Sequence, residues 1–209
     1  MKTLADCKLY GILDLGYVPL TDVESVARLM LRPGGVDILQ LRAKKLSPDV
    51  IETLGRRIHA LSSQAGIPLI INDHPEIAGK LCTEGAHIGQ DDGPLAEARK
   101  KAHSSCWIGR STHSLDQAVA AMEEGADYIG FGPLFATPTK PDYTAIGLEK
   151  IRDLHERITL PIFCIGGIKR GNLPAIVAAG AKRVVIVSGI LQAENIPQYM
   201  EDCRNLLKD

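Results

Sequence analysis

Hydrophobic residues along this chain fall into eight short runs separated by longer stretches of mixed character. Each run is too short for a helix, and several are nearly unbroken Val, Ile and Leu, which is typical of strands buried on both faces of a parallel sheet. The runs cover 9–13, 38–41, 69–71, 86–89, 107–109, 128–132, 161–165 and 184–187. Polar and glycine residues cluster at the downstream ends of seven runs and not at the upstream ends.

The stretches between the runs have apolar residues at helical spacing, as at Val50, Leu54 and Ile58. This spacing predicts amphipathic helices that pack one face against the sheet. Residues that favour helix starts and glycines that favour left-handed helix ends bound these stretches. The expected starts are Asp22, Ser47–Pro48 and Ser114, and the expected ends are Gly66, Gly85, Gly125 and Gly180. Strand and helix therefore alternate along the chain.

Eight strand–helix units predict an α/β fold, a (β/α)8 TIM barrel formed as a single domain over residues 1–209. The mean unit is about 26 residues, compact beside the usual barrel of about 250 residues. An open doubly wound sheet is the alternative. We favour the barrel because it gathers all its strand ends around one mouth, whereas an open sheet concentrates ligand groups at one switch point.

Composition limits the partners and the cellular location that we expect for this protein. A formal net charge of −1 and a charged fraction of 23% argue against nucleic acid as a main partner. No apolar stretch reaches membrane-spanning length and the first residues do not resemble a signal peptide, so we expect a cytoplasmic protein that acts on small molecules. The five cysteines lack CxxC spacing, which favours buried thiols over disulfides or structural zinc. A homodimer paired through the helices is compatible with a barrel of this size.

Charged residues of both signs follow several of the runs. Arg42, Lys44 and Lys140 would bring three cations to one mouth, which suits a ligand with several negative charges. Asp73 and Asp92 follow neighbouring strands and would form either structural ion pairs or a magnesium site. Mg²⁺ is commonly held by one or two carboxylates together with substrate phosphates and waters. Cations, carboxylates and metal together describe a bound pyrophosphate better than a single phosphate.

A second anion site is expected after the last two strands. Gly166–Gly167 follows the seventh run and Ser188–Gly189 follows the eighth. The loops after strands 7 and 8 are the habitual phosphate site of this architecture, with backbone N–H groups as donors. The alternative is that these glycines only make tight turns. Two anion sites indicate two substrates.

Two histidines invite a catalytic interpretation. His113 lies two positions beyond Ser111, but both residues fall in a strand-to-helix turn with no evident acidic partner. We therefore favour a role for His113 at the start of the following helix. His87 lies inside the fourth run, and we favour a packed barrel residue over a catalyst.

Seven short motifs along the chain together resemble the thiamine-phosphate synthase family. They are Q-L-R-A-K at 40–44, I-N-D at 71–73, H-I-G-Q-D-D at 87–92, G-R-S-T-H-S at 109–114, G-P-L-F-A-T-P-T-K at 132–140, I-G-G-I at 165–168 and V-S-G-I at 187–190. Each motif alone is weak, but their order and spacing match over essentially the whole chain. The resemblance implies a transferase of thiamine biosynthesis that needs Mg²⁺. It would join 4-amino-2-methyl-5-(diphosphooxymethyl)pyrimidine to a thiazole phosphate, plain or 2-carboxylated, and release pyrophosphate by a dissociative displacement.

The resemblance also implies site residues. Those expected to hold the pyrimidine diphosphate are Gln40, Leu41, Arg42, Ala43, Lys44, Asn72, Ser111 and Lys140, of which Arg42, Lys44, Ser111 and Lys140 would take part in catalysis. Those expected to hold the thiazole phosphate are Thr137, Pro138, Thr139, Gly167, Val187 and Ser188, and the expected metal ligands are Asp73 and Asp92. The family commonly has an arginine after I-N-D. Here His74 stands there, which puts an extra phosphate contact in doubt.

Two other functions remain as alternatives. A thiazole tautomerase of the same superfamily shares G-R-S-x-H-S and the turn after the last strand, but it lacks the complete acidic pair and the T-x-T-K segment. This chain has both features. A non-catalytic binder of phosphorylated heterocycles is the alternative from another class. Release of pyrophosphate would distinguish the synthase from both.

Overall fold

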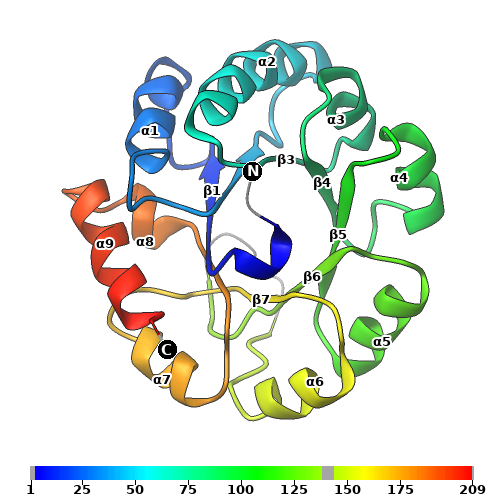
Figure 1. The fold of residues 1–209 in the computed structure, drawn as a ribbon, viewed down its shortest axis with the longest axis vertical. Helices are drawn as coiled ribbons and strands as arrows, with labels where there is room; N and C mark the ends of the chain where they lie inside the picture. Colours follow the sequence, from blue (N-terminus) through cyan, green and yellow to red (C-terminus); the bar gives the residue numbers. More distant parts are fainter. Residues whose placement is uncertain (1–2, 138–143, 209) are drawn as a thin grey trace.

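The computed structural model describes residues 3–137 and 144–208. Its eight strands form a closed, all-parallel barrel in chain order, with β8 pairing back to β1 (Figure 1). The strands are β1 Leu9–Asp14, β2 Ile38–Arg42, β3 Leu69–Asn72, β4 Gly85–Ile88, β5 Trp107–Thr112, β6 Tyr128–Phe131, β7 Ile162–Cys164 and β8 Val184–Ile186. Each predicted run overlaps one strand, and the bounds differ by up to three residues. The predicted barrel is confirmed and the open sheet is excluded.

Helices surround the barrel and connect successive strands (Figure 1). They are η1 Leu4–Asp6, η2 Leu20–Asp22, α1 Val23–Met30, α2 Pro48–Ala65, α3 Pro75–Leu81, α4 Leu95–Lys101, α5 Leu115–Glu123, α6 Ile151–Arg157, α7 Leu173–Ala178, α8 Ser188–Leu191 and α9 Ile196–Leu206. The predicted start of α5 is confirmed, since the Ser114 side chain accepts a hydrogen bond from the Gln117 amide. The predicted end of α2 is also confirmed, because Gly66 adopts a left-handed conformation at φ +67°.

The prediction that Gly85 ends a helix is wrong. Helix α3 ends earlier, at Cys82, which itself adopts the left-handed conformation with φ +51°. Gly85 instead begins β4, where a Cβ would lie 2.8 Å from the Trp107 carbonyl oxygen. The glycine therefore serves close strand packing and not a helix end.

Alternation along the strands decides which side chains face the barrel interior. Successive residues of a strand point to opposite faces, so Ile38, Gln40 and Arg42 share one face of β2. Ile38 belongs to the apolar cluster inside the barrel, and Gln40 and Arg42 therefore lie above it toward the carboxyl end of the strand. The interior cluster is Cys7, Tyr10, Ile12, Ile38, Ile70, Tyr128, Phe163 and Val185. The larger apolar core lies between strands and helices.

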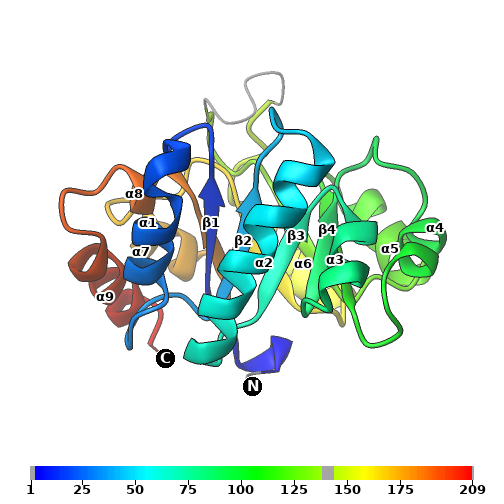
Figure 2. The ribbon, with the colours of Figure 1, turned by 90° about the horizontal axis from the view of Figure 1, so that it is seen from above.

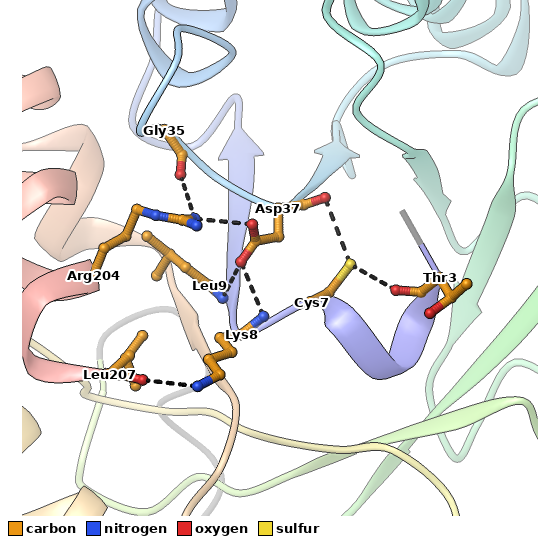
Figure 3. Close-up of polar contacts among 8 residues, drawn as sticks. All are labelled: Thr3, Cys7, Lys8, Leu9, Gly35, Asp37, Arg204 and Leu207. Atoms are coloured by element: carbon orange, nitrogen blue, oxygen red, sulfur yellow. Dashed lines mark hydrogen bonds and ion pairs between the residues drawn. The ribbon is translucent and has the colours of Figure 1, made fainter. Parts of the chain in front are cut away.

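A buried carboxylate organises the amino-terminal end of the barrel. Asp37 is 1% exposed and accepts 2.9 Å hydrogen bonds from the backbone N–H groups of Lys8 and Leu9 (Figure 3). Arg204 of α9 donates 2.9 Å hydrogen bonds to Asp37 and to the Gly35 carbonyl. We call these five residues the Asp37 cluster. It joins the start of β1, the approach to β2 and the last helix, at the end where both termini lie (Figure 2).

The cysteines follow the sequence prediction with one exception. Cys7, Cys106, Cys164 and Cys203 are buried, whereas Cys82 is exposed, and none is in a disulfide. Burial raises the pKa of Cys106 and of Cys164 to about 12 and that of Cys203 to about 11.

Over residues 3–137 and 144–208, no helix combines the length and apolar character needed to cross a membrane.

Candidate active site

A cleft opens at the carboxyl ends of the strands, with an empty volume of about 920 Å³ including its open mouth. Its floor is the aromatic part of the interior cluster, and its walls come from strands and loops all around the barrel. The predicted site residues that line it are Gln40, Arg42, Asn72, Ser111, Thr137, Gly167, Val187 and Ser188. The structure therefore brings together residues that lie far apart in the sequence.

The guanidinium of Arg42 is held by a carboxylate that sequence reasoning missed. Asp14, 2% exposed at the end of β1, lies 2.5 Å from Arg42 Nη1 and also accepts the Gly16 N–H at 2.8 Å. The two residues are register partners on β1 and β2. Because one guanidinium carries five N–H donors, Arg42 keeps donors for an anion while Asp14 fixes its orientation.

Asp73 and Asp92 interact with each other at the ends of β3 and β4. Burial raises the pKa of Asp73, the adjacent Asp92 carboxylate raises it further, and Lys44 opposes both effects. Lys44 Nζ lies 3.1 Å from the Asp73 carboxylate. Two carboxylates that repel each other near a single lysine favour an added cation, since the cation would relieve the repulsion.

The backbone around the acidic pair fixes its position. Asp73 has φ +64° and donates its N–H to the His87 carbonyl at 2.8 Å. Asp92 Oδ2 accepts the Gly89 N–H at 2.6 Å. Within the described residues, no group of three or more His, Cys, Asp or Glu side chains could hold a metal. Two carboxylates alone suit Mg²⁺, whose other ligands are then phosphate oxygens and waters.

A backbone-lined region lies across the barrel, after β7 and β8. Gly166 and Gly167 have φ +98° and +64°, and a Cβ on Gly167 would lie 2.7 Å from the Phe135 Cβ. Val187 and Ser188 begin the short helix α8, whose first N–H groups have no intrahelical acceptor. These residues combine backbone donors with space for a ligand, as a phosphate requires.

Ser111 is bonded to a histidine other than the one its motif suggests. His87 Nε2 lies 3.0 Å from Ser111 Oγ, and His87 Nδ1 lies 3.2 Å from the Tyr128 hydroxyl. His87 lies in the barrel wall as expected, and its hydrogen bonds to Ser111 and Tyr128 are a feature that the sequence did not reveal. His113 donates its N–H to Gln117 at 2.7 Å, as expected of a residue at the start of α5.

Some predicted residues contribute differently or lie outside the described part of the chain. Leu41 and Ala43 are buried, at 1% and 5% exposure, and neither is among the residues that line the cleft. His74 is 2.8 Å from Glu76 and is engaged there. Three predicted residues, Pro138, Thr139 and Lys140, fall outside the described residues.

Comparison with known proteins adds independent findings. A family model described as thiamine monophosphate synthase matches residues 9–190, which include all eight strands. Thiamine-phosphate synthases from Shouchella clausii and Thermus thermophilus are 40% and 44% identical over 190 and 161 residues, which cover 90% and 77% of both partners respectively. The solved structure of a thiamine phosphate pyrophosphorylase from Pyrococcus furiosus has a TM-score of 0.86 at 29% identity, covering 96% of this chain and 95% of that one.

Proposed function

This chain belongs to the thiamine-phosphate synthase family of transferases, and we propose that it joins a pyrimidine diphosphate to a thiazole phosphate with release of pyrophosphate. The substrates are 4-amino-2-methyl-5-(diphosphooxymethyl)pyrimidine and 4-methyl-5-(2-phosphoethyl)thiazole or its 2-carboxy form. The observation that carries this proposal is the pairing of Asp73 with Asp92 beside Lys44, opposite the backbone-lined region after β7 and β8. The carboxyl end of the barrel thus offers separate places for a diphosphate and a monophosphate, with Lys44, Asp73 and Asp92 beside the cleft and not among its lining residues.

The cationic side supports departure of the diphosphate. Negative charge grows on the leaving oxygen as the carbon–oxygen bond breaks, and fixed cations stabilise that charge best when they need not reorient. Arg42 is held by Asp14, and Lys44 lies beside Asp73. The family resemblance assigns Lys140 to the same anion. Asp73 and Asp92 would hold Mg²⁺, which supplies further positive charge toward the diphosphate when bound.

The remaining residues orient the two rings. All five of these residues line the cleft, where Gln40, Asn72 and Ser111 would contact the pyrimidine substrate and Gly167 and Ser188 the thiazole phosphate. The pyrimidine amino group can donate electrons to the carbon that loses pyrophosphate, so the ring nitrogen of the thiazole attacks without a side-chain nucleophile. The protein's contribution is positioning and electrostatic stabilisation.

The pair of Asp73 and Asp92 distinguishes this proposal from the two alternative functions, a thiazole tautomerase and a non-catalytic binder of phosphorylated heterocycles. Neither alternative needs a carboxylate pair to hold Mg²⁺ beside a departing diphosphate. Purified protein with both substrates and Mg²⁺ should release pyrophosphate and form thiamine phosphate, and running the two thiazoles in parallel identifies the preferred one. Failure to release pyrophosphate with either thiazole would refute the proposal.

A matched pair of neighbouring aspartates sharpens the assay. Asp91 and Asp92 are adjacent and both exposed, but Asp92 is the one that interacts with Asp73. We expect Asp92→Asn to lower pyrophosphate release about 100-fold, because the proposed Mg²⁺ site loses a carboxylate ligand and the leaving diphosphate loses the charge that the ion would supply. Asp91→Asn should leave it near the wild-type rate. Equal losses in the two variants would contradict the assignment of Asp92.

A further inference from the structure

A continuous chain of polar contacts runs from the barrel interior to Ser111. Gln40 Nε2 lies 2.7 Å from the Tyr10 hydroxyl, and the Tyr10 and Tyr128 hydroxyls lie 3.2 Å apart. The Tyr128 hydroxyl is 3.2 Å from His87 Nδ1, and His87 Nε2 is 3.0 Å from Ser111 Oγ. We call these five residues the Ser111 relay. It connects four strands other than the one that carries Ser111.

The donor and acceptor of each hydrogen bond in the relay can be assigned by starting from Gln40 Nε2, which can only donate. An amide nitrogen only donates, so the Tyr10 oxygen accepts from Gln40. Tyr10 and Tyr128 are each 1% exposed, and burial raises the pKa of both phenols, so both keep their protons. Among the contacts described for Tyr10, the acceptor left for its proton is the Tyr128 oxygen.

The same reasoning continues to the cleft. Tyr128 accepts a hydrogen bond from Tyr10 and donates its own hydroxyl hydrogen in a hydrogen bond to His87 Nδ1. The imidazole proton then lies on Nε2. Nε2–H then donates to Ser111 Oγ. The hydroxyl proton of Ser111 is left to point into the cleft that this residue lines.

We propose that the Ser111 relay fixes the Ser111 hydroxyl as a hydrogen-bond donor to an acceptor atom of the pyrimidine diphosphate, with His87, Tyr128 and Tyr10 as positioning residues. This inference deepens the proposed function and rests on it. A serine hydroxyl otherwise rotates freely between donating and accepting orientations. A fixed donor costs no reorientation when charge develops on the substrate.

The aromatic packing shows that the relay is held rigidly. The Phe163 ring meets Tyr10 and Tyr128 edge-on, at centroid distances of 5.4 and 5.6 Å and angles of 84° and 81°. Gly109 on the neighbouring strand makes room for Tyr128, because a Cβ there would lie 2.1 Å from the tyrosine Cζ. The Tyr128 hydroxyl therefore has little freedom to leave His87.

Two substitutions of one residue test the relay. The amide of His87→Gln reaches the position of Nε2 and can still donate to Ser111, whereas that of His87→Asn reaches only the position of Nδ1, toward Tyr128. We expect His87→Gln to keep kcat within about threefold of wild type and His87→Asn to lower it about tenfold, the effect of one hydrogen bond. KM for the thiazole phosphate should stay unchanged in both.

A double variant tests whether His87 acts through Ser111. If it does, Ser111→Ala combined with His87→Asn should be no slower than Ser111→Ala alone. Additive losses, or equal losses in His87→Gln and His87→Asn, would mean that His87 acts only through packing and would overturn the proposal.

The imidazole tautomer can be measured without any substrate. Nitrogen-15 NMR of wild-type protein should show the His87 proton on Nε2. In Tyr128→Phe the Nδ1 nitrogen loses the hydroxyl that donates to it, so the fraction of the Nδ1–H tautomer should increase. A wild-type Nδ1–H tautomer would make His87 the donor to Tyr128 and Ser111 the donor to His87, and would overturn the proposal. The measurement also separates the two hypotheses. Wild-type protein that releases no pyrophosphate refutes the proposed function, whereas the tautomer reports on the relay itself.

Discussion

Two carboxylates at opposite ends of the barrel show how differently the fold treats buried charge. Asp37 at the amino-terminal end is 1% exposed and receives two backbone N–H groups and one guanidinium (Figure 3). Asp73 at the carboxyl end has Lys44 beside it, while burial and Asp92 raise its pKa. The first carboxylate is satisfied by the protein itself. The second stays close to a like charge, which fits our proposal that a bound cation completes its surroundings.

The largest effect on stability should come from Asp37→Ala. Removing the buried partner of this ion pair should cost about 3 kcal/mol, because the N–H groups of Lys8 and Leu9 and the partly exposed Arg204 guanidinium all lose their acceptor. Urea unfolding followed by circular dichroism would measure the loss. Asp49→Ala is the control, since Asp49 is an exposed carboxylate in the first turn of α2 and should cost less than about 1 kcal/mol. Equal costs for the two variants would contradict the role of the Asp37 cluster.

Asp73→Asn should show the opposite pattern. We expect pyrophosphate release to fall about 100-fold, because the proposed Mg²⁺ site beside the leaving diphosphate loses one of its two carboxylates. The free energy of unfolding at pH 7 should be unchanged or higher, because the variant removes a buried charge that Asp92 repels. Steady-state kinetics and urea unfolding on the same preparation measure both. If Asp73→Asn lost as much free energy of unfolding as Asp37→Ala, Asp73 would have the same stabilising role as Asp37, and the comparison of the two carboxylates would be wrong.

The pH dependence of this second effect follows from the direction of the pKa shift. The pKa of Asp73 is raised in the folded state, so the folded protein binds the proton more tightly than the unfolded chain does. Ionisation therefore removes stability as the pH rises from the usual carboxyl range through the raised pKa. The stability advantage of Asp73→Asn should be greatest at neutral pH and should shrink as the pH falls toward about 4. An advantage that grows on acidification would contradict the raised pKa.

A third carboxylate lies between these extremes. Asp14 is satisfied like Asp37, but its partner Arg42 lines the cleft. We expect Asp14→Asn to lower kcat/KM about tenfold, since Arg42 loses the charged partner that orients it. Combining Asp14→Asn with Arg42→Ala should add little to Arg42→Ala alone, as double-mutant kinetics would show. Fully additive losses would mean that Asp14 does not act through Arg42.

Sequence patterns predicted the parts of this molecule that depend on local chemistry. The eight runs gave the strands and their order, because buried parallel strands are recognisable from composition and length. The polar residues after them were correctly expected to meet at one mouth, since the carboxyl ends of barrel strands converge. The role of Asp14 and the bond between His87 and Ser111 were missed. Both depend on which residues face each other across neighbouring strands, and that register is fixed by tertiary packing.

The smallest expected effect on the free energy of unfolding comes from backbone strain at a residue with positive φ. Among the described residues, Asp73 and Cys82 are the non-glycine residues with positive φ, at +64° and +51°. Cys82 ends α3 on the surface, away from the cleft-lining residues, so Cys82→Gly should relieve strain and stabilise the fold by about 0.5 kcal/mol with unchanged kcat. Asp73→Gly relieves the same kind of strain but should abolish most activity, as urea unfolding and kinetics of the two variants would show. If Cys82→Gly also slowed turnover, the positive φ at Cys82 would matter for activity as well, and the contrast with Asp73 would fail.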